Sequence, residues 1–65
     1  MKYIVIEIQN GTCTAYSYDT AAEAQNKYYT ILSYAAVSDV QRHGAYLLDN
    51  EGNLLEKRFF IKYEP

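Results

Sequence analysis

Cys13 and His43 are the residues of this 65-residue chain that could act as a nucleophile and its general base, because the chain has one cysteine and one histidine. Such a pair also needs a third group that orients the imidazole, and the sequence marks none. The strand pattern described below places Cys13 beneath a helix, beside Ile8, where a cysteine behaves as a small apolar residue. We therefore expect no enzyme and no catalytic residue, and interpret His43 as a half-exposed residue of a strand.

Metal binding is the second chemistry to consider. One cysteine and one histidine do not supply the ligands of an ordinary zinc site. Asp49, Glu51 and Asn53 stand at alternate positions, as the first ligands of a calcium loop do. However, Gly52 comes too early to be the glycine of that loop, and Phe60 occupies the position of its bidentate glutamate. The segment instead predicts a hairpin turn, and we expect no metal and no cofactor.

The length allows one small domain, residues 1–65, because separate cores usually need on the order of 100 residues each. Hydrophobic residues make up 49% of the chain and charged residues 22%, which is a globular balance. A chain of this size has a thin core and usually gains stability from a disulfide, a metal or a partner. With a single cysteine and no metal ligands, a partner or a second copy is the expected source.

The net charge of −2 argues against a protein that holds duplex nucleic acid on a basic face, because neither sign of charge forms a block along the chain. No apolar run approaches the ~18 residues of a membrane span. The chain passes from Met1 and Lys2 directly into a strand-like segment, without a secretory signal. Together with the lone cysteine, this pattern favours a soluble protein of a reducing cytoplasm.

A first hairpin is predicted over residues 3–18. Residues 3–9 alternate in the period of a half-buried strand, and Asn10 with Gly11 is the strongest short signal for a two-residue turn. The second strand then covers residues 12–18, and the loop length fixes the register. The predicted pairs are Ile8 with Cys13, Ile6 with Ala15, Ile4 with Ser17, Val5 with Tyr16, and Tyr3 with Tyr18.

A helix is predicted from the cap at Asp19 and Thr20 to about Val37. Thr20 and Glu23 have the spacing of a capping box, and the segment that follows is rich in alanine and free of glycine. One stripe at helical spacing should be buried, and it comprises Ala21, Ala24, Tyr28, Ile31, Leu32 and Ala35. We expect this stripe to cover the sheet face on which the isoleucines pair with small residues.

A second hairpin follows, with strands over residues 40–48 and 54–63 joined by a type I turn in which Gly52 takes the left-handed position. The simplest register places Ala45, Leu47, Leu55, Phe59 and Ile61 on one face and Tyr46, Leu48, Leu54, Glu56, Arg58 and Phe60 on the other. The fold class is therefore α+β, of order β-β-α-β-β, with a four-stranded, mainly antiparallel sheet and one helix on one face. The strand order is not determined.

Eight tyrosines are the unusual feature of the composition. They are Tyr3, Tyr16, Tyr18, Tyr28, Tyr29, Tyr34, Tyr46 and Tyr63. A single helix leaves one sheet face uncovered, and we predict an interface on that face formed by Tyr3, Val5, Tyr16, Tyr18, Tyr46 and Phe60.

Three occupants of this face are possible. Self-association by packing of two sheets is the first, and docking on a different protein is the second. The third is stacking of a nucleotide or single-stranded nucleic acid on the tyrosines, with phosphate contacts from Lys2, Arg42, Arg58 and Lys62. Glu7 and Glu56 argue against the third.

Four segments carry a family resemblance: KYIVIEIQ at the start, AYSYD before the capping box, KYYTILSYAAVS in the helix and GAYLLDNEG at the second turn. Together they resemble small uncharacterised proteins of phages and prophages from gut Firmicutes, encoded near tail and lysis genes. No functional residue is established for that group. The resemblance implies a viral origin, a setting in the bacterial host cytoplasm or the virion, and an accessory role in binding a host or phage component.

Overall fold

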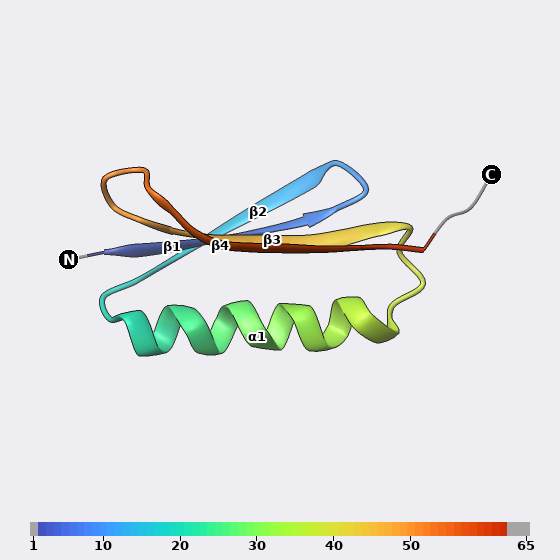
Figure 1. Cartoon of the computed structure of the whole chain (residues 1–65), viewed down its shortest axis with the longest axis horizontal. Helices are drawn as coiled ribbons and strands as arrows, with labels where there is room; N and C mark the ends of the chain where they lie inside the picture. The colour runs from blue at the N-terminus through green and yellow to red at the C-terminus, as the bar shows by residue number, and fades with distance from the viewer. Residues whose placement is uncertain (1, 63–65) are drawn as a thin grey trace.

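The computed structural model describes residues 2–62 and has the element order β-β-α-β-β (Figure 1). The strands are β1 (Tyr3–Gln9), β2 (Thr12–Tyr18), β3 (Arg42–Asp49) and β4 (Leu54–Ile61), and the helix is α1 (Ala21–Val37). The helix lies along one face of a single four-stranded sheet, and the other face has no covering layer among these residues. The predicted α+β class is confirmed.

The strand order of the sheet is β2-β1-β3-β4, and every neighbouring pair is antiparallel. Since β2 and β3 both flank β1 in the opposite direction, they run parallel to each other, and α1 connects them by crossing over β1. The helix packs mainly on β3 and β1, the two central strands. The two outer strands, β2 and β4, form the edges of the sheet.

The first hairpin has the register that the sequence predicts, from Tyr3 opposite Tyr18 to Ile8 opposite Cys13. Asn10 and Gly11 both have positive φ, of 51° and 91°, as a type I′ turn requires. Asn10 also joins this turn to the start of β3, because its N–H donates to the Arg42 carbonyl at 2.8 Å and its Oδ1 accepts from the Arg42 N–H at 3.0 Å.

The helix begins and ends where the sequence places it. The Thr20 hydroxyl accepts a hydrogen bond from the Glu23 N–H at 3.2 Å, and this caps the first turn. The predicted stripe is confirmed in its centre, where Ala24, Tyr28, Ile31 and Ala35 are buried, and Leu32 packs beside them. At the other end, the Ser38 hydroxyl accepts from the Val40 N–H at 3.0 Å as the chain leaves the helix.

The second hairpin has the predicted turn, with Gly52 at φ 88° and its N–H donating to the Asp49 carbonyl. The Asp49 carboxylate holds this turn by accepting hydrogen bonds from Glu51 and Asn53. The strands are shorter than expected: β3 begins at Arg42 rather than Val40, and β4 ends at Ile61. The predicted strand end at Tyr63 lies outside the described residues.

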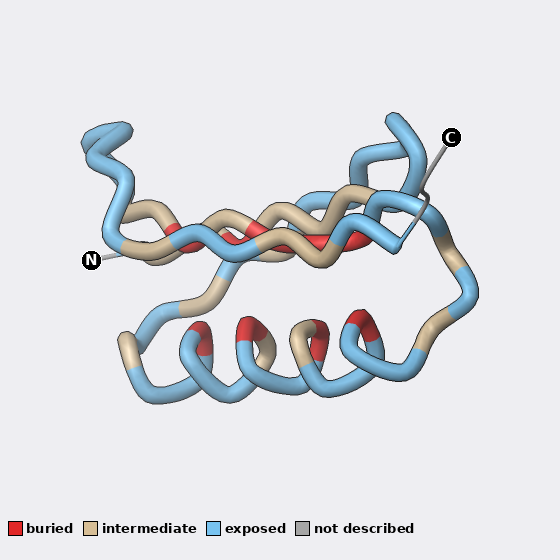
Figure 2. The backbone as a smooth tube through the Cα atoms, turned by 45° about the vertical axis from the view of Figure 1, so that its right-hand side comes forward, coloured by how far each residue is buried: buried red, intermediate tan, exposed pale blue. Residues whose placement is uncertain are grey.

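One expectation about the core is wrong: α1 covers the sheet face that carries Val5, and the isoleucine face is the uncovered one. Val5 is fully buried and forms the core with Ala24, Tyr28, Ile31, Ala45 and Leu47. The buried segments of helix and sheet face each other in Figure 2. Ile4, Ile6 and Ile8 point to the opposite side and are only half-buried.

The expected faces of β4 are also reversed. The predicted register holds for Leu48 opposite Leu54, but a bulge between Leu47 and Leu48 then places Leu47 opposite Glu56 and leaves Leu55 unpaired. Because side chains alternate along a strand, one extra residue moves every later side chain to the other face. Phe60 therefore lies on the helix side, opposite His43, and Phe59 lies on the uncovered side.

Candidate binding surface

The uncovered sheet face carries a group of apolar side chains outside the core. Directly opposed residues in an antiparallel sheet share a face, so the pairing assigns its members. We call this set the open face, and its large apolar residues are Ile4, Ile6, Ile8, Tyr46, Leu48, Leu54, Phe59 and Ile61. Leu54 and Ile61 are about half exposed, at 49% and 55%, and the others are intermediate. The rest of the face consists of Cys13, Ala15 and Ser17 on β2, with Arg42, Gly44 and Lys57 on β3 and β4.

Of the six residues predicted for the interface, only Tyr46 lies on the open face. Val5 is buried beneath α1, and Tyr3 and Tyr18 pack against the core from the helix side. Tyr16 is also on that side, where the Lys27 ammonium of the helix lies 4.3 Å from its ring centroid.

Phe60, the sixth predicted residue, faces the helix side, and the Arg58 guanidinium lies 5.5 Å from its ring. The predicted set is therefore not brought together, because the helix occupies the face on which most of its members lie.

Tyr46 and Phe59 form the aromatic part of the open face. Their ring centroids are 5.3 Å apart in an edge-on arrangement. Gly44 leaves room for this arrangement, since a Cβ built at Gly44 would lie 2.5 Å from Cγ of Phe59 and 2.4 Å from the Arg58 carbonyl oxygen. The absence of a side chain at Gly44 thus lets the Phe59 ring approach the backbone of β3.

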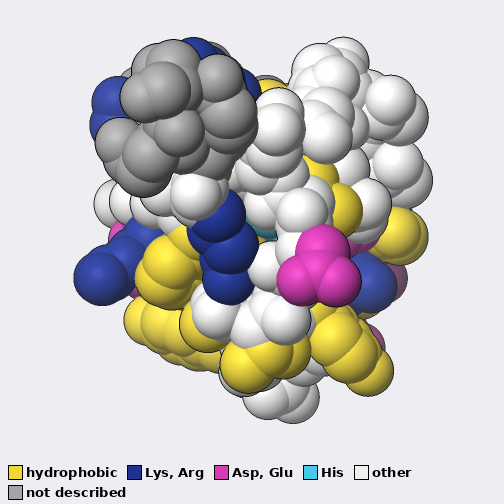
Figure 3. Space-filling view, turned by 90° about the vertical axis from the view of Figure 1, so that its right-hand side faces the viewer, with side chains coloured by type: hydrophobic (Ala, Val, Ile, Leu, Met, Phe, Trp, Pro, Cys, Tyr) yellow, Lys and Arg dark blue, Asp and Glu magenta, His cyan; other side chains and the backbone are white. Residues whose placement is uncertain are grey.

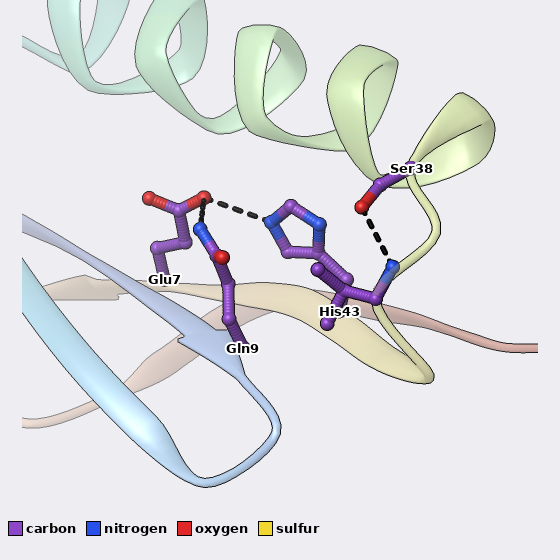
Figure 4. Close-up of polar contacts among 5 residues, drawn as sticks. Glu7, Gln9, Ser38 and His43 are labelled. Carbon is purple, nitrogen blue, oxygen red and sulfur yellow. Dashed lines mark hydrogen bonds and ion pairs between the residues drawn. The ribbon is translucent and has the colours of Figure 1, made fainter.

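A hydrogen-bonded pair, Glu7 and His43, lies on the helix side of the sheet (Figure 4). Nε2 of His43 is 2.8 Å from Oε2 of Glu7, and His43 is buried, not half-exposed as its sequence position suggests. Gln9 donates to the same carboxylate at 2.9 Å. Burial raises the pKa of Glu7, but the hydrogen bonds from His43 and Gln9 outweigh burial and hold that pKa below its ordinary value. Sequence reasoning missed this pair, because only the β1–β3 pairing brings the two residues together.

A shallow polar depression of about 210 Å³ lies beside this pair and is lined by Glu7, Gln9, Thr12 and Thr14. Its groups offer a carboxylate, an amide and two hydroxyls, which are able to hydrogen-bond a small polar molecule. Within residues 2–62, no three side chains of His, Cys, Asp or Glu come together as a metal site would require. The turn residues Asp49, Glu51 and Asn53 are engaged with one another in the hairpin.

Cys13 and His43 do not form a pair. Cys13 is exposed on the open face, opposite Ile8, and not beneath the helix as the sequence led us to expect. His43 is opposite Gln9 on the helix side. The sheet itself therefore separates the thiol from the imidazole.

Basic and acidic side chains are interspersed at the end of the molecule that Figure 3 faces, with hydrophobic side chains between them.

Over the described part of the chain, no helix is long and apolar enough to cross a membrane. Comparison with the models of known protein families, with curated proteins and with solved structures gives no match. The resemblance to phage proteins therefore stays a prediction.

Proposed function

We propose that this chain is a small non-catalytic binding protein that self-associates by packing its open face against the open face of a second copy. The observation that carries this proposal is the row of Ile4, Ile6 and Ile8 on a central strand, with no layer above it in residues 2–62. A monomer rarely exposes a continuous apolar patch of more than a few hundred Å². Covering this patch would also add to the thin core of a 65-residue chain.

The distribution of side-chain size on the open face supports a second copy as its occupant. The bulky residues Tyr46, Phe59 and Ile61 lie on β3 and β4, whereas β2 presents only Cys13, Ala15 and Ser17. A twofold axis parallel to the strands places β4 of one copy over β2 of the other. Bulky side chains then pack against small ones at both ends of the contact, as two interdigitating sheets require.

The same arrangement avoids repulsion between like charges. Arg42 and Lys57 are the charged residues that the pairing assigns to the open face, and both lie on the β3–β4 half. In this arrangement Lys57, on β4, lies over β2 of the second copy and meets small uncharged side chains, and Arg42, on β3, lies over β1, whose open-face residues are isoleucines. A stack of β4 on β4 would instead bring the two Lys57 ammonium groups together.

The proposed setting is the cytoplasm of a bacterial host, with an accessory role for a phage or prophage. It is supported by the resemblance of the KYIVIEIQ and GAYLLDNEG segments and by the single cysteine. Separation of Cys13 from His43 by the sheet supports a binding rather than a catalytic role. Support for base stacking is weaker than the sequence suggested, since Tyr3, Tyr16 and Tyr18 are on the helix side.

The test is the mass in solution across a dilution series, measured by light scattering, for the wild type and for Ile6→Lys. Ile6 is at the centre of the open face, so a lysine there should lower the mass of the assembly. Gln25→Lys, on the exposed side of the helix, is the matched control and should keep the wild-type mass. Equal masses for the wild type and Ile6→Lys would overturn the proposal.

A different occupant of the open face would give a different result. A wild type that is monomeric at every concentration would also overturn self-association. Quenching of tyrosine fluorescence by a single-stranded oligonucleotide at low salt would then favour stacking of bases on Tyr46 and Phe59.

A further inference from the structure

The outer edge of β2 is the second unpartnered feature of the sheet. β2 pairs with β1 along one side only, and nothing among residues 2–62 pairs with its other side. The two-residue loop closes on the pair Gln9 and Thr12, and hydrogen-bonded pairs alternate along an antiparallel ladder. The backbone N–H and C=O groups of Cys13, Ala15 and Ser17 therefore point away from β1.

The two edges of the sheet differ in how well they are protected. β4 carries three consecutive charged residues, Glu56, Lys57 and Arg58, and is interrupted by the bulge next to Leu48. Charges and bulges are the devices by which sheet edges avoid pairing with other strands. β2 has the sequence TCTAYSY, with no charge and no proline, and its register with β1 is regular over all seven residues. The outward backbone N–H and C=O groups of β2 can therefore pair with another strand.

We propose that β2 pairs antiparallel with β2 of a second copy, so that two sheets join into one of eight strands. The contact goes beyond the proposed function, because it uses backbone groups at the sheet edge rather than side chains of the open face. A twofold axis at Ala15 places Ala15 opposite its own copy and Cys13 opposite Ser17 of that copy. This axis is perpendicular to the sheet and keeps both helices on the same side.

A second copy fits this edge because β2 is complementary to itself. Its seven residues carry no charge, so antiparallel pairing opposes no like charges. On the helix side, Thr14 of each copy lies opposite Tyr16 of the other, and on the open side all the paired residues are small. A twofold axis at Lys57 of β4 would instead place this lysine opposite its own copy. The edge without charges is therefore the one suited to a symmetric contact.

Disulfide trapping tests the register directly. Ser17→Cys, with Cys13 retained, places two thiols in directly opposed positions with Cα atoms about 5.5 Å apart, within the range of a disulfide. Mild oxidation should give a covalent dimer of twice the 7.5 kDa chain mass on a non-reducing gel. Within one chain the two cysteines are four residues apart, about 13 Å along the strand, and do not bridge.

Two controls with one cysteine per chain distinguish a cross-link formed in the proposed strand register from one formed when two chains collide at random. The wild type and the Cys13→Ser, Ser17→Cys double variant should both stay monomeric on the same gel. Stacked sheets are about 10 Å apart, too far for a disulfide, so packing of open faces does not produce the cross-link. Absence of the dimer in Ser17→Cys, or equal dimer in the double variant, would overturn the edge proposal.

Ala15→Pro is the second variant, because it removes an N–H that points outward and leaves the ladder to β1 intact. It should lower the mass in solution while the far-UV circular dichroism stays that of the wild type. An unchanged mass would contradict edge pairing. The two proposals can also be told apart. If the cross-link persists in an Ile6→Lys, Ser17→Cys variant, pairing of β2 edges is supported. If Ile6→Lys also has the mass of the wild type, the open-face proposal is overturned.

Discussion

Nε2 of His43 donates a hydrogen bond to the carboxylate of Glu7 across 2.8 Å, joining residues 36 positions apart in the chain. The bond lies on the helix side of the sheet, where His43 is buried and Glu7 is mostly buried. Since a carboxylate accepts but does not donate, the His43 proton of this bond is on Nε2. The other ring nitrogen, Nδ1, is buried and has no hydrogen-bond partner within residues 2–62. Among residues 2–62, the Glu7 carboxylate is therefore the one hydrogen-bond partner of the buried imidazole, and it satisfies Nε2.

Loss of the Glu7 carboxylate should destabilise the fold. In Glu7→Ala, both nitrogens of His43 are left without a protein partner, and a buried unsatisfied polar group costs about 1–3 kcal/mol. Glu7→Gln keeps one oxygen as an acceptor and should lose less. Urea denaturation followed by circular dichroism measures both. Equal stability of wild type and Glu7→Ala would show that the bond contributes nothing net.

Asp49 should make stability depend on pH through the second hairpin turn. Hydrogen bonds from the Asn53 side chain and backbone hold the pKa of the Asp49 carboxyl below its ordinary value of 3.8. A carboxyl with a lowered pKa in the folded state contributes stability above its unfolded value and loses that contribution as the pH falls through its folded value.

The comparison for this pH effect is Asp49→Asn, which keeps an oxygen acceptor but does not titrate. The stability advantage of the wild type over Asp49→Asn should be present at pH 6 and shrink at about pH 2.5. Urea midpoints at the two pH values measure the difference. An advantage that stays constant or grows at acid pH would contradict the assignment.

Gly44→Ala should destabilise the protein by about 1–3 kcal/mol, the usual cost of forcing extra atoms into a packed site. The added methyl group would lie 2.4 Å from the Arg58 carbonyl oxygen, which is backbone and does not move freely. Phe59→Ala removes the ring, so the double variant should recover part of the loss but not all of it. Thermal denaturation of the three variants measures this, and a stable Gly44→Ala would show that β3 and β4 pair differently.

Val5 and Ile6 are neighbours in sequence on opposite faces of the sheet, and lysine substitutions should distinguish them. Val5 is fully buried beneath α1, so Val5→Lys places a charge in the core and should abolish cooperative unfolding. Ile6→Lys changes the open face and should keep the helical circular dichroism spectrum. The reverse outcome would mean that the helix covers the isoleucine face.

The sequence determined the elements and the first hairpin by local chemistry. Asn10 and Gly11 take the positive φ values that set the register of β1 and β2, Thr20 caps the helix, and Gly52 closes the second turn. These features depend on residues within a few positions of each other, so a single sequence specifies them.

The tertiary structure alone decided which sheet face α1 covers. Alternation in residues 3–9 defines two faces, but the choice between them depends on the path of the chain from β2 over β1 to β3, and therefore on the strand order. The bulge beside Leu48 decided the faces of β4, because one extra residue moved Phe60 to the helix side and Phe59 to the open face. The pairing of β1 with β3 also created the contact between Glu7 and His43. The choice of face and the Glu7–His43 contact rest on residues far apart in sequence, and the bulge breaks the simple alternation inside one hairpin, so the local pattern specifies none of the three.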